Sequence, residues 1–490
     1  MTLQSVNPRT GESFGPQFTD MSASEVAEVI AASLSVFSQW SAAQPSERKR
    51  AIYAIADAID AHRDELVELS DLETGLGKAR LTGEVGRTTF QLRMSADAAA
   101  SGEFTSPKID KAVDAPLPQG HPELIRTTTA IGVVAIFGAS NFPFAFSVLG
   151  GDTAAALSAG CTVISKTHSA HPQTAMRTAE IAREALTTAG FSKNILNLVH
   201  GHEAGKTLLK DSRISAGAFT GSRGGGRALF DMATSREVPI PFYGELGSVN
   251  SVVVLESALN DPQTFASAYV DSLLLGNGQF CTNPSILYLP DGSAVITAID
   301  ENLATREAAP FLSRSTKASH DKNRADVRAL LKPRVVNGKA APSVGFFSSP
   351  EIHFSTIKDV SVNPEALNIE CFGPTGLVVT YSNDAELLEL LAGIEGALVG
   401  SLFASADDPQ LPIFARALAN KVGRVTLNAW PTGLAVTAGQ NHGGPYPAST
   451  SPLHTSVGTS AITRFLRPVS FQSFSEGLLS SIANNIEKGK

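Results

Sequence analysis

The sequence predicts an α/β protein with at least two domains. Its 490 residues exceed the length that one hydrophobic core usually supports. From residue 131 onward, apolar β-rich runs alternate with helix-forming segments, which is the pattern of a doubly wound parallel sheet. Ligands of such sheets bind beyond the carboxyl ends of the strands. Polar residues just after a strand are therefore the first candidates for a functional site.

Composition favours an intracellular protein that acts on small molecules. The chain has 39 Lys and Arg against 47 Asp and Glu, a net charge of −8, which argues against nucleic acid or a membrane surface as the main partner. Cys161, Cys281 and Cys371 are widely spaced and predict neither disulfides nor a zinc site. The first residues do not resemble a signal peptide, and no run approaches about 18 apolar residues. We expect a cytoplasmic protein.

The elements can be placed in chain order. Residues 22–100 carry apolar side chains at helical spacings of three and four, and the Pro/Gly-rich stretch 115–122 then interrupts the chain before a strand-like segment at 123–129. Beyond it, we expect strands at 131–137, 162–166, 194–199, 214–220, 285–289, 377–381, 397–403 and 423–428, and helices that begin at Asp152 or Thr153 and that span 172–189, 203–210, 385–391 and 410–418.

A glycine-rich turn, Gly221-Ser-Arg-Gly-Gly-Gly226, follows the strand at 214–220. Glycines let backbone N–H groups approach a phosphate, and Ser222 can cap a helix whose N-terminus attracts anions. The spacing matches neither of the common glycine-rich nucleotide motifs. By itself this turn could equally be structural.

A cysteine and a carboxylate are the strongest candidates for chemistry. Cys281 lies in the turn-rich loop 276–284, where the backbone can present a thiol. A lone cysteine is usually a small buried hydrophobe, and a nucleophilic one needs a base or surroundings that lower its pKa. Glu245 stands between Gly244 and Gly247 after a predicted strand and could be that base, although most carboxylates are simply solvated.

Together these segments resemble the aldehyde dehydrogenase superfamily over nearly the whole chain. Its signature elements occur in the same order here: Ser140-Asn-Phe-Pro143, Lys166, Phe219-Thr-Gly-Ser-Arg-Gly-Gly-Gly226, Glu245-Leu-Gly247, Gly278-Gln-Phe-Cys281 and Glu370-Cys-Phe-Gly-Pro374. The resemblance implies a Rossmann-like dinucleotide-binding domain (1–114 and 131–246), an α/β catalytic domain (247–467) and a small β arm for oligomerisation (115–130 and 468–490), and hence a homodimer or homotetramer.

The resemblance also implies a role for each matched residue. Cys281 would attack an aldehyde as a thiolate, Asn141 and the Cys281 backbone N–H would hold the oxyanion, and Glu245 would activate water to hydrolyse the thioester. The implied cofactor contacts are Lys166 and Glu370 at ribose hydroxyls, Ser222 with Gly221 and Gly226 at the pyrophosphate, and Phe372 at the nicotinamide ribose.

Cofactor choice depends on the residue three positions after Lys166. Relatives that prefer NAD commonly have Glu there, which repels a 2′-phosphate, whereas this chain has Ser169. We therefore expect NADP, with NAD as the alternative and Lys206 as a second candidate for contacting the phosphate.

Departures from the common family pattern indicate which branch of the family the sequence resembles. Ser140 and the run Ser248-Val-Asn250, with Gly443-Gly-Pro-Tyr-Pro-Ala-Ser-Thr, resemble the bacterial 2,5-dioxovalerate (α-ketoglutaric semialdehyde) dehydrogenases, a branch that also holds fatty aldehyde dehydrogenases. The expected reaction is thus oxidation of 2,5-dioxopentanoate, with medium or long aliphatic aldehydes as the alternative. Phe142, Phe146 and Trp430 are the candidate walls of the substrate tunnel.

Other interpretations are weaker. The His168/His171 and His200/His202 pairs lack nearby Cys or carboxylate ligands at metal-site spacing, so we expect no metal. A cysteine hydrolase would use half of the same chemistry and would need no nicotinamide cofactor. A non-catalytic binding protein would not need Asn141, Glu245, Cys281 and Glu370 together.

Overall fold

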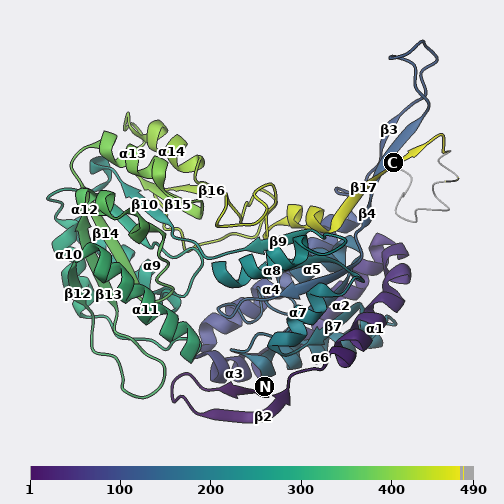
Figure 1. Cartoon of the computed structure of the whole chain (residues 1–490), viewed down its shortest axis with the longest axis horizontal. Coiled ribbons are helices and arrows are strands. Elements are labelled where there is room, and N and C mark those ends of the chain that lie inside the picture. The colour runs from purple at the N-terminus through teal and green to yellow at the C-terminus, as the bar shows by residue number, and fades with distance from the viewer. Residues whose placement is uncertain (1, 475–477, 479–490) are drawn as a thin grey trace.

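A computed structural model describes residues 2–474 and residue 478. The chain forms two lobes, each built on its own β-sheet, and a narrow arm that projects from the first lobe (Figure 1). The predicted α/β class, with a Rossmann-like parallel sheet, a second α/β unit and a small β arm, is confirmed.

The first lobe contains a five-stranded, fully parallel sheet in the order β7-β6-β5-β8-β9. The strand order reverses between β5 and β8, and ligands of doubly wound sheets bind at such a point. Lys166 pairs with Phe137, and Glu245 pairs with Thr220, so both predicted site residues lie at the carboxyl edge. The strands are β5 (Val133–Phe137), β6 (Thr162–Lys166), β7 (Leu196–Val199), β8 (Ile214–Thr220) and β9 (Phe242–Glu245).

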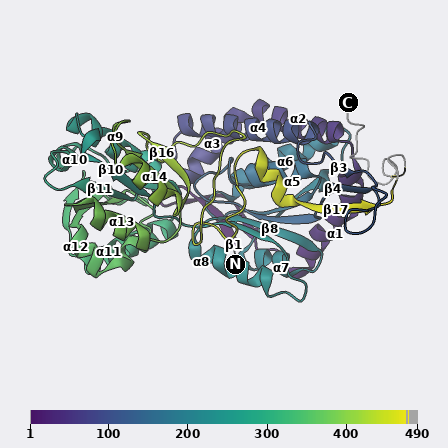
Figure 2. The same ribbon diagram turned by 90° about the horizontal axis from the view of Figure 1, so that it is seen from above.

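Helices cover both sides of this sheet. Figure 2 shows α2 and α4 along one side of the lobe and α7 and α8 along the other. A continuous apolar core joins α2, α4, α5 and α6 to strands β5 and β6. The helices are α1 (Ala23–Ala42), α2 (Pro45–Ala61), α3 (Arg63–Thr74), α4 (Lys78–Ala100), α5 (Gly151–Ala159), α6 (Pro172–Thr188), α7 (His202–Lys210) and α8 (Arg223–Thr234).

The second lobe contains a seven-stranded sheet in the order β12-β13-β14-β11-β10-β15-β16, parallel except for β12. Its strands are β10 (Ser251–Val254), β11 (Ile286–Pro290), β12 (Arg334–Asn337), β13 (Glu351–Thr356), β14 (Thr375–Tyr381), β15 (Ala397–Phe403) and β16 (Val422–Leu427). Its helices are α9 (Pro262–Leu274), α10 (Val295–Ala304), α11 (Arg314–Leu331), α12 (Ile357–Val362), α13 (Asp384–Gly393) and α14 (Leu411–Ala419). The proposed boundary at 246/247 falls between β9 and β10, and the exact domain limits stay a prediction.

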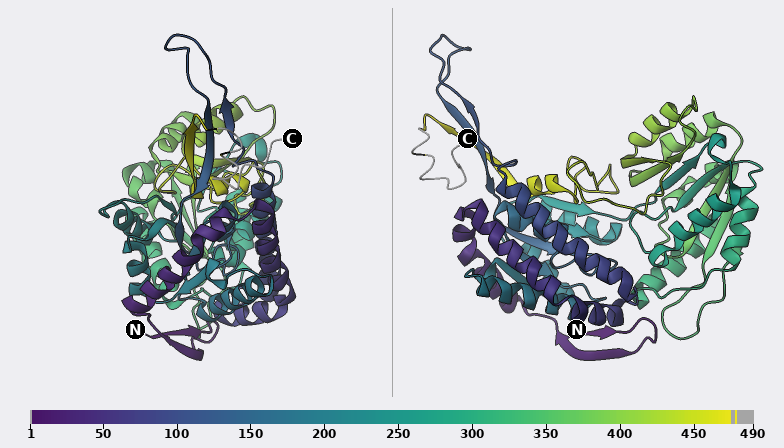
Figure 3. Two further views of the ribbon diagram at one scale, coloured as in Figure 1. Left: turned by 90° about the vertical axis from the view of Figure 1, so that its right-hand side faces the viewer. Right: turned by 180° about the vertical axis from the view of Figure 1, so that it is seen from behind.

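The arm is a three-stranded antiparallel sheet of β3 (Lys108–Asp110), β4 (Leu124–Ala130) and β17 (Leu466–Gln472), which Figure 3 shows standing clear of both lobes. Its strands begin slightly outside the predicted arm segments, because β3 precedes residue 115 and β17 starts before residue 468. Most of the predicted tail segment beyond residue 474 lies outside the described residues.

The structure differs from the sequence analysis at two local features, an unpredicted hairpin and the cap of α5. The hairpin of β1 (Thr2–Val6) and β2 (Ser13–Thr19) was not predicted. Gly150 precedes α5, so neither Asp152 nor Thr153 is the cap. Asp152 instead forms a buried ion pair with Arg464, 2.8 Å away, which accounts for an acidic residue inside the first turn. In the described part of the chain, no helix is long and apolar enough to span a membrane.

Candidate active site

The loop that carries Cys281 has an unusual backbone. Gly276, Asn277 and Gly278 all have positive φ angles, of 58°, 59° and 68°. A Cβ atom on Gly278 would collide with the carbonyl oxygen of Gly373, so glycine is needed both for its conformation and for the close approach. This contact holds the loop of Cys281 against the segment that carries Glu370.

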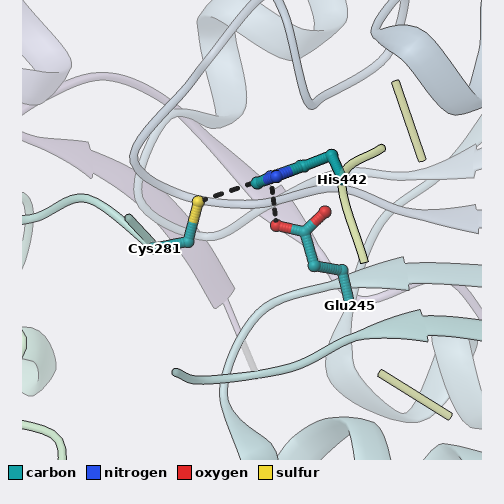
Figure 4. A group of neighbouring side chains, drawn as sticks. All are labelled: Glu245, Cys281 and His442. Carbon is teal, nitrogen blue, oxygen red and sulfur yellow. Dashed lines mark hydrogen bonds and ion pairs between the residues drawn. The ribbon is translucent and has the colours of Figure 1, made fainter. Parts of the chain in front are cut away.

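Cys281, His442 and Glu245 form a compact cluster (Figure 4). The His442 Nε2 lies 3.7 Å from the Cys281 Sγ and 2.9 Å from a Glu245 carboxylate oxygen. The other Glu245 oxygen accepts a hydrogen bond of 2.6 Å from Ser456. Glu245 and His442 are almost fully buried, whereas Cys281 is partly accessible. The three residues come from β9, from the loop after α9 and from the long segment between β16 and β17.

The surroundings oppose ionisation of the thiol. Burial and the neighbouring Glu245 carboxylate raise the pKa of Cys281 well above its usual range, and the Arg87 guanidinium opposes this rise only in part. Burial also disfavours a charged Glu245, but contacts with His442 and Ser456 outweigh it and lower the pKa of that carboxyl. The shifts in pKa therefore favour an ionised Glu245 carboxylate beside a protonated Cys281 thiol.

Asn141 reaches the nucleophile loop from the first lobe. Its side-chain amide donates a 2.9 Å hydrogen bond to the carbonyl of Gln279, two residues before Cys281. An amide NH₂ has two hydrogens, so one is left for another acceptor. Arg80 on α4 fixes the Asn141 backbone by donating to its carbonyl at 2.6 Å. The predicted oxyanion donor is thus placed beside the loop of Cys281.

A buried polar network supports the loop from the second lobe. The Asn250 amide donates to the carbonyls of Cys281 at 2.8 Å and Asn283 at 3.0 Å. The Ser248 hydroxyl donates to the Asn250 side-chain oxygen, and the Ser248 backbone N–H donates to Glu370. These are the residues at which the sequence departs from the common family pattern. The departure builds a connection between the nucleophile and Glu370.

Two of the predicted cofactor residues, Ser222 and Glu370, line one cavity of about 460 Å³ between the two lobes. Ser222 caps α8 as predicted, because its hydroxyl accepts the Gly225 backbone N–H. Glu370 also faces this cavity, and burial raises its pKa to about 7. Gly221 lies just before the cap, and Gly226 is buried against Phe219 and Leu246 with no room for a side chain. Phe372 is half-buried two residues after Glu370. A helix N-terminus, glycines and a buried carboxyl group fit a dinucleotide.

The residues expected near the adenosine ribose differ from one another in burial and in their partners. Lys166 is half-buried at the end of β6, and burial lowers its pKa. Ser169 is exposed in the loop that follows. Lys206 is ion-paired to Glu203 at 2.8 Å, so a cofactor phosphate would have to compete with that carboxylate.

Two of the three predicted tunnel residues lie near the nucleophile. The Phe142 ring packs edge-on against Phe280, the neighbour of Cys281, at 5.2 Å between centroids, and Phe146 lies 6.1 Å from the His442 ring. Trp430 packs instead among Phe265, Tyr269 and Phe403 in the second lobe. The structure brings Phe142 and Phe146 together, at 5.4 Å, and does not bring Trp430 into their cluster.

Sequence reasoning missed three residues of the site. His442 has no motif of its own, although it directly precedes the Gly443-Gly-Pro run used for the resemblance. Asn250 was noticed only as a departure. Arg87 shares one helix face with Arg80 and Glu84, a pattern visible from spacings of four and three. Glu245, Cys281 and His442 also place three metal-binding atoms within 4.8 Å of one another, away from the histidine pairs considered from the sequence.

The fold and this site define an oxidoreductase of the aldehyde dehydrogenase type. The profile of the aldehyde dehydrogenase family matches residues 1–468, and the chain belongs to that family. It therefore oxidises aldehydes with a nicotinamide cofactor.

Two curated relatives match nearly the whole chain. The α-ketoglutaric semialdehyde dehydrogenase of Acinetobacter baylyi is 36% identical, and α-ketoglutaric semialdehyde dehydrogenase 2 of Azospirillum brasilense is 37% identical, each over 98% of this chain and 92% of the relative. Among solved structures, a mutant aldehyde dehydrogenase C of Pseudomonas syringae, complexed with NAD⁺ and octanal, superposes with a TM-score of 0.82 at 19% identity, covering 97% of this chain and 94% of that one.

The raised pKa of Cys281 predicts slow alkylation at neutral pH. In the apoenzyme, the rate of Cys281 labelling by iodoacetamide should rise with an inflection above the ordinary thiol value of about 8.5. Replacing Glu245 by Gln removes the adjacent negative charge, so the inflection should move to lower pH. Labelling followed by mass spectrometry checks this, with Cys281→Ser as the unlabelled control. An unchanged or higher inflection in Glu245→Gln would contradict the electrostatic explanation.

Proposed function

We propose that this enzyme oxidises 2,5-dioxopentanoate to 2-oxoglutarate and uses NADP. The observation that carries the substrate is the identity of 36–37% over 98% of the chain to two α-ketoglutaric semialdehyde dehydrogenases. The Cys281–His442–Glu245 cluster supports the chemistry, because it sets a thiol beside a base, and the Asn141 amide contacts the same loop at the Gln279 carbonyl. We also propose a cytoplasmic location, in keeping with three free cysteines.

Each side chain of the cluster has a proposed task. The thiol proton of Cys281 passes to the His442–Glu245 pair, and the Sγ attacks the aldehyde carbon. The carbonyl oxygen becomes an oxyanion that accepts from the Asn141 amide and the Cys281 backbone N–H. When bound, the nicotinamide cofactor supplies the hydride acceptor that converts the thiohemiacetal to a thioester.

Glu245 serves again in the second half of the reaction. It takes a proton from a water that attacks the thioester carbon, and the Cys281 Sγ leaves. The hydrogen bonds from Ser456 and His442 orient the carboxylate for this task. Glu370, Ser222 and Lys166 hold the cofactor, with Gly221 and Gly226 leaving space for its pyrophosphate and Phe372 beside its nicotinamide ribose.

Substrate preference tests the proposed activity. With NADP, kcat/KM for 2,5-dioxopentanoate should exceed that for pentanal, which has the same chain length, by tenfold or more, equivalent to about 1.4 kcal/mol of transition-state binding. Initial rates of NADPH formation measure both. A preference for pentanal, or for longer aliphatic aldehydes, would assign the enzyme to the alternative substrate class.

Ser169→Glu tests the choice of cofactor. Ser169 is exposed and uncharged, so it leaves room for a 2′-phosphate, whereas a glutamate there would repel it and could bind the ribose hydroxyls of NAD. The variant should raise KM for NADP by about tenfold or more and leave KM for NAD equal or lower. Ser212→Glu, at an exposed serine after α7, is the control. Equal KM values for both cofactors in the unmodified enzyme would refute the NADP proposal.

The arm supports a homodimer or homotetramer. The connection between β3 and β4 carries Leu117, 87% exposed, and Val113, 45% exposed. Light scattering after gel filtration should give at least twice the chain mass. Replacing residues 111–121 by a two-residue turn should shift the mass downward or weaken association. A monomer at micromolar concentration in the unmodified protein would exclude the proposal.

A further inference from the structure

We propose that Arg87 binds the carboxylate of the aldehyde substrate and thereby selects aldehydes that carry an acid group. This inference rests on the semialdehyde activity proposed above and names the residue that recognises the acid end. Arg87 lies on α4 in the first lobe, and its task is distinct from the chemistry at Cys281.

Two aromatic contacts connect Arg87 to the reacting centre. Its guanidinium carbon lies 5.2 Å from the Phe146 ring centroid and 5.6 Å from the Phe142 centroid. Phe146 in turn contacts His442, and Phe142 contacts Phe280. Arg87 thus lies against the two predicted tunnel rings, which in turn contact His442 and the neighbour of Cys281.

The separation suits a short acid. The contacts through Phe146, of 5.2 Å and 6.1 Å, place the guanidinium within about 11 Å of the His442 ring. A five-carbon chain attached to a sulfur spans roughly 7 Å from the sulfur to its far carboxyl carbon at ordinary bond lengths. A carboxylate–guanidinium contact adds about 4 Å. The Cys281 Sγ lies 3.7 Å from the His442 Nε2, and the charges of Arg87 and Cys281 act on each other's pKa. The guanidinium therefore lies on the scale of distance that the acid end of a five-carbon semialdehyde on Cys281 can span.

Among the described residues, Arg87 forms no salt bridge. Its Nε donates a long hydrogen bond of 3.4 Å to Gln91, and its Nη2 is buried with no hydrogen-bond partner among the described residues. Glu84, three residues earlier, accepts hydrogen bonds on one oxygen from the backbone N–H groups of Phe144 and Ala145. Its other oxygen is buried without a hydrogen-bond partner in the described part of the chain, so Glu84 acts on Arg87 through its charge and not through a hydrogen bond. A buried, unsatisfied guanidinium is costly, and a carboxylate is the ligand that satisfies it best.

The local charge points the same way. Arg80 and Arg87 flank a single carboxyl group, Glu84, on one face of α4, so the cluster has an excess of positive charge. Burial lowers the pKa of the Arg87 guanidinium, and the charges of Glu84, Cys281 and Glu245 oppose that change. An incoming carboxylate would supply the missing negative charge.

The other nearby arginines already donate hydrogen bonds to backbone carbonyls. Arg80 donates to the Asn141 carbonyl and stacks on Phe142 and Phe280, so it positions the oxyanion donor and the nucleophile loop. Arg424 on β16 donates both of its terminal nitrogens to the backbone carbonyls of Pro431 and Gly433. Arg80 also has a buried Nη1 without a hydrogen-bond partner, but its guanidinium stacks on Phe280, beside Cys281, whereas that of Arg87 lies over Phe142 and Phe146, the candidate walls of the substrate path.

The test compares Arg87→Met and Arg87→Lys with the unmodified enzyme on three aldehydes: 2,5-dioxopentanoate, 5-oxopentanoate and pentanal. We expect Arg87→Met to lower kcat/KM for both acids by at least 30-fold, mainly through KM, and to change that for pentanal by less than threefold. Arg87→Lys should recover part of the loss for the acids. Arg93→Met is the matched control, because Arg93 lies on the same helix but pairs with Asp57 and Asp60 at the surface.

The outcomes separate the two proposals. Preference of the unmodified enzyme for pentanal would refute the proposed function. If that enzyme prefers the acids and Arg87→Met keeps the preference, the role of Arg87 alone is refuted. An equal loss on all three aldehydes, with unchanged Tm and NADP binding, would mean that Arg87 only supports the site. A loss for 2,5-dioxopentanoate but not for 5-oxopentanoate would assign Arg87 to the keto oxygen and overturn carboxylate binding.

Discussion

The contact on which this site depends is the close approach of a buried carboxylate to a thiol, bridged by an imidazole. Glu245 comes from the edge of the first sheet, Cys281 from the second lobe and His442 from the segment that returns toward the arm. Burial penalises an isolated charge, so it disfavours the charged form of the Glu245 carboxyl. Contacts with His442 and Ser456 lower the pKa of Glu245 and so favour the carboxylate. The negative charge of that carboxylate in turn raises the pKa of the Cys281 thiol and favours its protonated form.

The nucleophile is held by backbone contacts rather than by a rigid helix or strand. Gly278 lies against the Gly373 carbonyl, and Asn250 holds the carbonyls on both sides of Thr282. Through Ser248, this support continues to Glu370 in the cofactor cavity. Under the proposed role of Glu370, cofactor binding and placement of the Cys281 thiol would share one network. The run Ser248-Val-Asn250 therefore connects the loop of Cys281 to Glu370 in this chain.

Strand ends and helix caps were predictable because they follow local rules. Lys166, Ser222 and Glu245 lie where the alternation of strand and helix places them, since parallel strands bring their carboxyl ends to one edge. Asp152 was misjudged as a cap because its partner, Arg464, is more than 300 positions away. His442 and Trp430 lie in a long segment without regular structure, where sequence spacing gives no information on which lobe a side chain will face.

Selectivity for an aldehyde that carries an acid group follows from the buried Arg87 nitrogen, which an uncharged aldehyde would leave without a hydrogen-bond partner. An aliphatic chain lying along Phe142 and Phe146 gains apolar contact, but it leaves the terminal nitrogen of Arg87 buried without a partner. A carboxylate at the end of that chain removes this cost and forms a charge-assisted hydrogen bond. Sites built around a buried polar group reject ligands that lack the matching group more strongly than apolar pockets reject a change in size. The two aromatic rings therefore set the path of the chain, and the guanidinium against them decides which chains are accepted.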